Sequence, residues 1–237
     1  MTIWLNTPFE PRFRVIDGLA VRYAESPDRG APALLLGPWP ETILGYVPIW
    51  ERLAERAHLV ALDLPGFGHS QRRDELLSPR TMAEFVVRAA DAFHLDRPHV
   101  VGPGVVTAAA LFAAAGHPGR LRSLVVGSGP AAVPPEPDGS LPDAMLQDYL
   151  SAVAGDRFAA ALAYVRACPA DLQVLRELLP GIRTPVRIVT GATTGAEFPH
   201  HGLPDSRLTV LGSGPRPWQD APAEYAQLVT DWWTERG

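Results

Sequence analysis

The stretch with the clearest chemical pattern is VVGPGVVTAAALFAAAGHPGRL, residues 100–121. A short apolar run ends at Gly102 and an alanine-rich run follows, as where a strand turns sharply into a helix. The motif G-x-S-x-G presents a nucleophilic serine at such a turn. Aligned on that motif, residues 102–106 read Gly-Pro-Gly-Val-Val, which places Gly104 in the nucleophile position. The pattern therefore predicts a nucleophile turn in which glycine replaces the nucleophilic serine.

Two adjacent histidines form a second pattern that could do chemistry. His200 and His201 lie in the short, proline-broken segment EFPHHGLPDS, residues 197–206. Histidine is the usual general base near neutral pH, so either residue is a candidate for a displaced base. The alternative interpretation is an exposed loop pair with no catalytic role, and both interpretations stay open here.

Other polar residues stand where apolar runs end. Asp63 closes one run, at the edge where open sheets bind ligands, although such a residue more often holds the loop that follows it. Ser70 is predicted to bond that loop or cap a helix, and His69 before it follows a Gly-x-Gly turn. Ser128 follows another apolar run and is a candidate to border a pocket.

Composition excludes several classes of function. The 237 residues suffice for one full core, and the net charge of −5 favours neither nucleic acid nor an anionic membrane as partner. The single Cys168 excludes an internal disulfide and a multi-cysteine metal site, so no metal or cofactor is expected. No apolar run reaches the roughly 18 residues of a membrane span, and residues 1–14 lack the apolar segment of a signal peptide. With arginine as every cation, this composition predicts a bacterial, cytoplasmic protein.

Apolar runs alternate with stretches of helical periodicity along the chain. Strands are predicted at eight places: residues 13–17, 19–25, 33–36, 58–64, 99–102, 121–127, 186–191 and 207–212. Helices are predicted over residues 48–56, 79–93, 105–116 and 222–235. Because the strands read as buried on both faces, we expect a mostly parallel eight-stranded sheet with helices on both faces and an antiparallel hairpin at one edge.

The segment from about 130 to 180 interrupts this alternation. It opens with the proline-rich stretch PAAVPPEPDGSLP and continues with helical patterns over residues 142–154 and 156–167. We interpret residues 131–180 as a small helical lid inserted after the sixth strand, and residues 1–130 and 181–237 as the core domain.

Five segments, in order, resemble the α/β-hydrolase fold family. They are LLLGPWPET (34–42), ALDLPGFGHS (61–70), AGHPGRLRSLVV (115–126), TPVRIVTG (184–191) and LGSGPRPWQDAPAEYAQLVTDWW (211–233). The likeness covers nearly the whole chain, and it implies the fold just derived from the alternation of elements.

The resemblance also implies positions for a nucleophile, an acid and a histidine. These positions are Gly104, a residue near Thr194 and Pro215, and none of the three residue types can serve. The His-Gly pair that usually follows the third strand is here Gly37-Pro38. The segments around these three positions match the family, yet all three catalytic residue types are missing. This combination argues against a conventional serine hydrolase.

Two backbone N–H groups survive if the shape of the turn survives. By the resemblance they are those of Trp39 and Val105, which would face the oxygen of a bound carbonyl. The alternative is that these amides only cap the helix. The pocket in front of them is predicted to be bordered by Gly37, Pro38, Tyr46, Gly104, Ser128 and Trp218.

Aromatic residues gather in the segments expected around this pocket. They are Trp39, Tyr46, Trp50 and Trp218, which could stack on a planar ligand or fill a closed cavity. The leading hypothesis is a non-hydrolytic small-molecule enzyme, such as a cyclase, lyase or isomerase, or a binder, acting on an apolar carbonyl-containing metabolite. A second is a catalytically dead binding or scaffold subunit, with a homodimer or a partner protein. A third is a hydrolase with relocated catalytic residues.

Overall fold

The computed structural model describes residues 7–127, 129, 143–191 and 198–237. One sheet runs through it, in the order β1-β2-β4-β3-β5-β6-β7-β8. The strands are β1 (Arg12–Ile16), β2 (Leu19–Glu25), β3 (Ala31–Leu36), β4 (Ala57–Leu62), β5 (His99–Gly102), β6 (Ser123–Val126), β7 (Val186–Thr190) and β8 (Ser206–Val210). β2 is antiparallel to both neighbours and the other pairs are parallel. The predicted fold class is confirmed.

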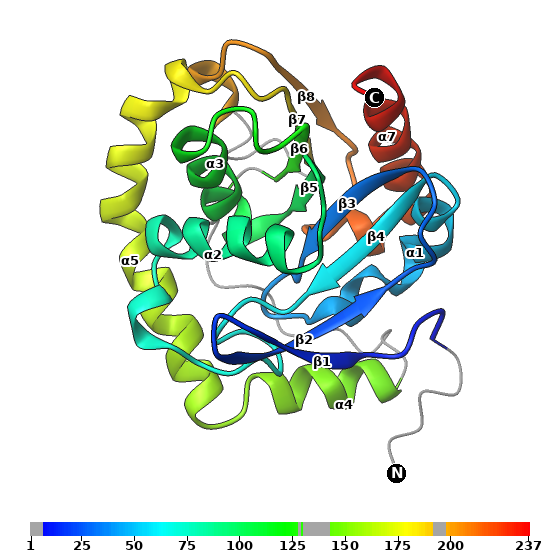
Figure 1. Cartoon of the computed structure of the whole chain (residues 1–237), viewed down its shortest axis with the longest axis vertical. Helices are drawn as coiled ribbons and strands as arrows, with labels where there is room; N and C mark the ends of the chain where they lie inside the picture. The colour runs from blue at the N-terminus through cyan, green and yellow to red at the C-terminus, as the bar shows by residue number, and fades with distance from the viewer. Residues whose placement is uncertain (1–6, 128, 130–142, 192–197) are drawn as a thin grey trace.

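Helices cover both faces of this sheet, as Figure 1 shows. The α-helices are α1 (Val47–Ala54), α2 (Pro79–Ala92), α3 (Thr107–Gly116), α4 (Asp143–Ala152), α5 (Asp156–Leu178), α6 (Pro217–Asp220) and α7 (Pro222–Glu235). Short 3₁₀ turns include η1 (Ile43–Tyr46), η3 (Gly104–Val106), η4 (Leu179–Gly181) and η5 (His200–Gly202). Helices α2, α3 and α5 lie on one face, and α1 and α7 lie on the other. None of the described helices has the length and apolarity needed to cross a membrane.

Strand β3 shows why the sheet is buried on both sides. Successive side chains of a strand point to opposite faces. Leu34 and Leu36 accordingly belong to the core under α2 and α3, whereas Ala33 and Leu35 belong to the core under α1 and α7. All four are fully buried. An unbroken apolar run is therefore required here, which is what the sequence carries.

The inserted segment differs from its predicted form in one respect. A helix was expected over residues 156–167, but α5 continues through Pro169 to Leu178. A proline inside a helix costs about 3 kcal/mol because it removes one backbone hydrogen bond. Tyr164 and Leu175, on either side of the proline, are fully buried in the core beside α2 and α3. Burial on both sides of Pro169 holds the helix together.

Candidate functional site

The turn between β5 and α3 keeps the shape of a nucleophile turn. The backbone leaves the strand at Gly102, passes Gly104 at a φ of +61°, and enters α3 at Thr107. The Thr107 hydroxyl donates to the Gly102 carbonyl at 2.9 Å and accepts from the Gly127 N–H at 3.1 Å. This side chain ties the turn to the end of β6. The predicted strand–turn–helix is present.

Among the described residues, the backbone at Gly104 has room for a side-chain atom. A Cβ placed on Gly104 would meet no described atom within 4 Å, whereas one on Gly127 would lie 3.0 Å from the Gly104 nitrogen. Glycine adopts the left-handed φ of this turn without the steric penalty that a side chain pays. A glycine thus relaxes the turn.

Substituting Gly104 tests this description of the turn. Gly104→Ala is expected to lower the free energy of unfolding by about 1–2 kcal/mol, because the positive φ is unfavourable for alanine although no clash occurs. The matched control is Gly116→Ala at the end of α3, where a Cβ also meets no described atom and helix propensity favours alanine. Urea denaturation should give opposite signs for the two variants. A stabilising Gly104→Ala would contradict the left-handed turn.

The two candidate backbone donors border this turn from different elements. The Val105 N–H lies in the first turn of η3, where no intrahelical acceptor exists. The Val105 carbonyl accepts a long bond, 3.5 Å, from the Tyr164 hydroxyl of α5. Trp39, in the loop after β3, is half-buried against the core beside α2 and α3. Both loops lie at the carboxyl edge of the sheet, where α/β folds bind ligands.

Of the acid and histidine positions that the resemblance implies, the histidine position is described and the acid position is not. Pro215 is exposed, in the loop between β8 and α6, at the same edge of the sheet as Gly104. That loop crosses the end of β7 so closely that a Cβ on Gly191 would lie 1.7 Å from the Gly214 carbonyl oxygen. Thr194 and Ser128 lie outside the described residues, and their places in the site stay predictions.

The two histidines are not at this edge, which corrects the hypothesis of a displaced base. His200 and His201 form η5 directly before β8, at the amino end of that strand. Because β5 and β8 run in the same direction, η5 lies at the opposite end of the sheet from Gly104. His200 Nδ1 bonds Ser206 Oγ at 2.8 Å and fixes the start of β8. Their spacing in the sequence carried no information about which end of the sheet they occupy.

The predicted aromatic cluster is divided by the sheet. Trp39 packs on the side of α2 and α3, whereas Tyr46, Trp50 and Trp218 are buried on the side of α1 and α7. The Tyr46 hydroxyl donates to the Leu36 carbonyl at 2.6 Å, so Tyr46 is a core residue. Of this group, Trp39 is the residue on the Gly104 side of the core.

Gly37 and Pro38 pack the loop after β3 closely against its surroundings. A Cβ on Gly37 would lie 2.9 Å from Asp63 Oδ1, and one on Gly45 would lie 3.0 Å from the Pro38 ring. Glycine is required at position 37 because the backbone there lies too close to the buried Asp63 carboxylate for a side chain. These two residues shape the loop that carries Trp39.

Asp63 anchors the loops on either side of it, as predicted. Its Oδ1 accepts the Ile43 N–H at 2.9 Å and its Oδ2 accepts the His69 N–H at 3.1 Å. The Ser70 hydroxyl donates to the Asp63 carbonyl at 2.6 Å and accepts the Arg22 N–H at 2.9 Å. Burial raises the pKa of Asp63, while Arg22 and the two N–H donors act in the opposite direction. Both carboxyl oxygens accept bonds, an arrangement that suits a carboxylate.

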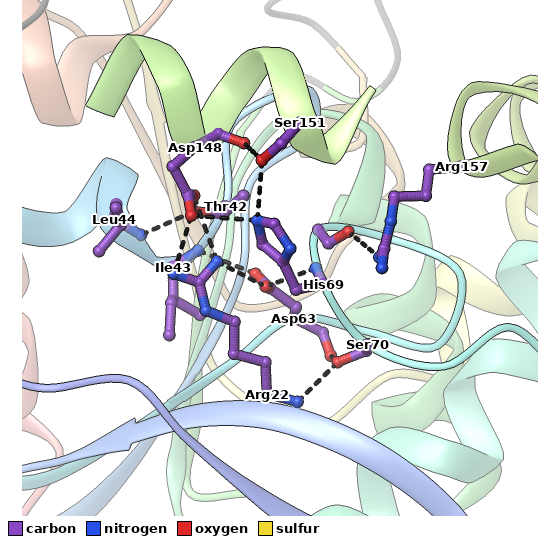
Figure 2. A network of polar contacts seen from close by, with 11 residues as sticks. Arg22, Thr42, Ile43, Leu44, Asp63, His69, Ser70, Asp148, Ser151 and Arg157 are labelled. Atoms are coloured by element: carbon purple, nitrogen blue, oxygen red, sulfur yellow. Dashed lines mark hydrogen bonds and ion pairs between the residues drawn. The ribbon is translucent and has the colours of Figure 1, made fainter. Parts of the chain in front are cut away.

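A second buried carboxylate joins this network from α4 (Figure 2). Asp148 Oδ1 lies 2.9 Å from Arg22 Nη2 and 3.0 Å from His69 Nε2, and Oδ2 accepts the Thr42 hydroxyl at 2.5 Å. Burial alone would raise the pKa of Asp148, but the bonds from His69, Arg22 and Thr42 and the Arg22 charge lower it to about 2. Sequence reasoning missed this network, because Asp148 is 126 residues from Arg22 and no local pattern joins them.

The His69 ring does not form a catalytic triad with its neighbours. Asp148 and Ser151 both approach its Nε2, at 3.0 and 3.4 Å. In a triad the acid and the nucleophile hold different ring nitrogens. The network is therefore built to hold α4, and among the described residues no group of three or more His, Cys, Asp or Glu could hold a metal ion.

Glu41 is another buried carboxyl near the same edge. Its Oε1 lies 3.5 Å from Arg216 Nη1, and its Oε2 has no hydrogen-bond partner among the described residues. Burial raises the pKa of Glu41, although a backbone hydrogen bond and the Arg216 charge oppose it. A cavity of about 10 Å³, room for about one water molecule, adjoins it under Met145 and Tyr149 of α4.

Comparison with protein families and curated proteins gives sequence relatives. Residues 34–169 match the family model described as alpha/beta hydrolase fold. The chain is 31% identical over 115 residues, 48% of its length, to the dihydrolipoyllysine-residue acetyltransferase component of the acetoin cleaving system of Cupriavidus necator. It is 38% identical over 87 residues, 35% of its length, to RutD of Caulobacter sp. (strain K31), assigned as a carbamate hydrolase. These matches span 31% and 32% of the relatives' own lengths.

Solved structures share the architecture over almost the full chain. Cfl2 from Burkholderia cenocepacia superposes with a TM-score of 0.80 at 22% identity, covering 94% of this chain and 95% of Cfl2. The epoxide hydrolase CorEH superposes with a TM-score of 0.79 at 16% identity, covering 96% of this chain and 98% of CorEH. CarC, a serine hydrolase involved in carbazole degradation, superposes with a TM-score of 0.76 at 18% identity, covering 96% of this chain and 100% of CarC. At these identities the likeness shows a common fold.

Proposed function

Because the chain belongs to the alpha/beta hydrolase fold family, we propose that it acts on a small molecule at the carboxyl edge of its sheet, without covalent serine chemistry. The observation that carries the proposal is Gly104, which has no nucleophilic side chain and where an added Cβ would meet no described atom within 4 Å. Pro215 has no ring nitrogen able to accept a proton, and Thr194 has no carboxylate.

The chemistry open to such a site is polarisation of a carbonyl by backbone donors. Two N–H groups aimed at one oxygen stabilise developing negative charge by about 3 kcal/mol each. With Trp39 and Val105 as donors, an enolate could form without a covalent intermediate, and the pocket would supply proximity. The reaction class that fits is a cyclisation, elimination or isomerisation of an apolar carbonyl-containing metabolite.

The names of the sequence relatives support a carbonyl group in the ligand. One relative is named for acetyl transfer and the other for carbamate hydrolysis. Both groups contain a carbonyl. We further propose that residues 131–180 act as the lid of this pocket and that the protein works in the bacterial cytoplasm.

The first experiment asks whether a reactive nucleophile exists. The protein is incubated with a fluorophosphonate probe and with an activated ester such as p-nitrophenyl acetate. Neither labelling nor turnover above that of the heat-denatured chain is expected, because the turn holds glycine. Labelling of a serine would overturn the proposal and favour a hydrolase with relocated residues.

The second experiment asks whether a ligand binds at the Gly104 turn. A library of carbonyl metabolites is screened by thermal shift, where a ligand at 100 times its Kd stabilises by about 2.7 kcal/mol. Gly104→Phe should abolish the shift by occupying this space with a large side chain, and Gly116→Phe, on the exposed end of α3, should keep it. If no compound shifts the melting temperature and one protein co-purifies in fixed stoichiometry, the binding or scaffold subunit replaces the enzyme as the conclusion.

A further inference from the structure

Strand β1 forms one edge of the sheet and lies exposed along most of its length. Among the described residues it pairs with β2 alone, as Figure 1 shows. Residues 12–15 are exposed, and only Ile16 at the end of the strand is buried. An edge strand presents a row of backbone N–H and C=O groups that can pair with another strand. The register of β1 with β2 decides which residues carry these free groups.

The turn between β1 and β2 fixes that register. Asp17 and Gly18 have φ values of +52° and +75°, and two positive φ values identify the type I′ turn of a two-residue hairpin. The residues on either side of such a turn form a hydrogen-bonded pair, and bonded and non-bonded pairs then alternate along the two strands. Val15 and Phe13, which pair with the second and fourth residues of β2, accordingly fall in non-bonded pairs.

The hydrogen bonds of β2 agree with this register. The Ala20 N–H donates to Gln71 Oε1 at 3.1 Å, and the Ala20 carbonyl accepts the Gln71 N–H at 2.8 Å. The Arg22 N–H donates to the Ser70 hydroxyl at 2.9 Å, and the Arg22 carbonyl accepts the Asp63 N–H at 3.0 Å. Both residues of β2 thus direct their backbone groups away from β1. The two β1 residues opposite them therefore direct their own N–H and C=O groups to the outer edge.

The side chains of the same two residues stand together on one face of β1. Successive side chains of a strand alternate between faces, and Phe13 and Val15 are 60% and 71% exposed. Arg12 and Arg14 occupy the other face, where each guanidinium lies over an aromatic ring, 5.6 and 4.8 Å from the ring centres. Charged side chains commonly protect an edge strand from pairing. Here those charges are drawn onto one face, and the apolar face carries the outward backbone groups.

We propose that β1 pairs antiparallel with β1 of a second copy of this chain, with Phe13 opposite Val15 of the second copy. A two-fold axis perpendicular to the sheet then passes between the two Arg14 residues, so the pair of Phe13 with Val15 occurs twice. Each pair exchanges both of its backbone hydrogen bonds, and every outward N–H and C=O of these two residues finds a partner. The side chains of each pair meet on one face, where an aromatic residue opposite a β-branched one stabilises a sheet.

Other registers of the same edge satisfy fewer of these groups. Placing Phe13 opposite its own copy sets Val15 opposite Pro11, which has no N–H to donate. Placing Val15 opposite its own copy sets Phe13 opposite Asp17, a residue of the turn. The proposed register has one unfavourable contact, Arg14 opposite Arg14, because like charges across a strand pair repel. Two short strands also bury little surface, so we expect a reversible dimer with a Kd in the micromolar range.

Sedimentation velocity on the full-length protein tests the dimer. Between about 1 and about 500 μM the wild type should pass from monomer to dimer. Val15→Pro removes an outward N–H and leaves the ladder with β2 intact, because an edge strand tolerates proline where the N–H faces solvent. This variant should raise the Kd at least about tenfold. Val15→Thr keeps both the N–H and the branched side chain, and it should dimerise as the wild type does.

A second pair of variants tests the apolar face of β1. Phe13→Lys removes the aromatic side chain and places a charge on the edge without altering a backbone group, so it should also raise the Kd at least about tenfold. The matched control is Val210→Lys, since Val210 is an exposed apolar residue of β8, at the opposite edge of the sheet. This control should keep the Kd of the wild type.

A disulfide tests the register. In the proposed dimer the two Arg14 residues form a non-hydrogen-bonded pair with Cα atoms about 4.5 Å apart, within reach of a disulfide. Arg14→Cys should therefore give a covalent dimer on mild oxidation. The two copies of residue 15 are diagonal neighbours at least about 7–8 Å apart, so Val15→Cys should cross-link far more slowly. The native Cys168 is buried, and the wild type serves as the blank for it.

Each contrary result overturns the β1 dimer. A wild type that stays monomeric over the whole concentration range would do so, even if no variant folded. Equal dimerisation of Val15→Pro and Val15→Thr would show that the backbone of β1 is not paired, and loss of the dimer in Val210→Lys would place the interface on β8. Equal cross-linking of Arg14→Cys and Val15→Cys would overturn the register. None of these residues belongs to the candidate site, so the dimer stands or falls separately from the proposed reaction.

Discussion

Arg22→Met is expected to lower the free energy of unfolding by about 3–5 kcal/mol, one of the largest effects of any single substitution in this chain. The side chain of Arg22 is 3% exposed and lies between Asp63 and Asp148, which are 1% and 8% exposed. Removing the guanidinium leaves two buried carboxylates without their principal cation, and breaking a buried pair costs this much. Methionine has a similar volume, so the loss is mainly electrostatic.

The measurement is urea denaturation at pH 7, with Arg120→Met as the matched control. Arg120 pairs with Asp91 on the surface, both side chains being about half exposed, so its loss should cost under about 1 kcal/mol. The double variant Arg22→Met/Asp148→Leu should recover part of the loss, because one stranded carboxylate is removed with its partner. Equal effects of Arg22→Met and Arg120→Met would show that the buried network contributes little.

The turn at Gly104 could be predicted from the sequence, whereas the network around Arg22 could not. The turn is local: an apolar run, glycines and an alanine-rich run follow one another within residues 100–116, and each has a direct backbone meaning. The strands follow for the same reason, since burial on both faces requires unbroken apolar runs. The predicted bounds of the strands accordingly agree with the structure to within about two residues.

Arg22, Asp63 and Asp148 come together only because a strand, a loop and a helix that are distant in the sequence meet in the fold. Nothing in the neighbourhood of any one of them in the sequence specifies the other two. The error over His200 and His201 has the same origin. Their residue types suit catalysis, but the strand that follows them decides which end of the sheet they occupy, and the preceding residues 192–197 lie outside the described part.

Helix α5 shows that tertiary packing can override a local sequence rule. Pro169 predicts a helix end near residue 167, and the rule is physically sound for an isolated segment. The helix continues because Tyr164 and Leu175 are both buried, and tertiary burial is worth more than one backbone hydrogen bond. Tyr164 of this helix also lies against Val105 of the candidate site.

The second large effect is a loss of stability in acid caused by His99. The ring is fully buried at the start of β5, bonds Ser123 Oγ through Nδ1 at 2.7 Å, and stacks on Trp233 with ring centres 5.5 Å apart. Burial lowers the pKa of His99 from 6.5 to about 4, with a smaller contribution from the charge of Arg122. The folded protein therefore holds this histidine neutral at neutral pH.

The sign follows from proton binding in the two states. Between pH 6.5 and about 4 the unfolded chain binds a proton at His99 and the folded chain does not, so acid favours unfolding. Lowering the pKa of His99 from 6.5 to about 4 corresponds to a loss of about 3 kcal/mol across this range, and none above pH 7.5.

Denaturant titrations at pH 7.5, 6.0 and 4.5 measure this slope in the wild type and in His99→Phe. The variant is expected to be less stable at pH 7.5, because it loses the bond to Ser123, yet its stability should fall more gently in acid. His94→Asn is the control: His94 is exposed at a positive φ that asparagine tolerates, and its removal should leave the wild-type slope. Since every carboxylate titrates alike in all three proteins, the difference in slope isolates His99. Parallel curves for the wild type and His99→Phe would mean that the ring accepts a proton inside the fold as readily as in water.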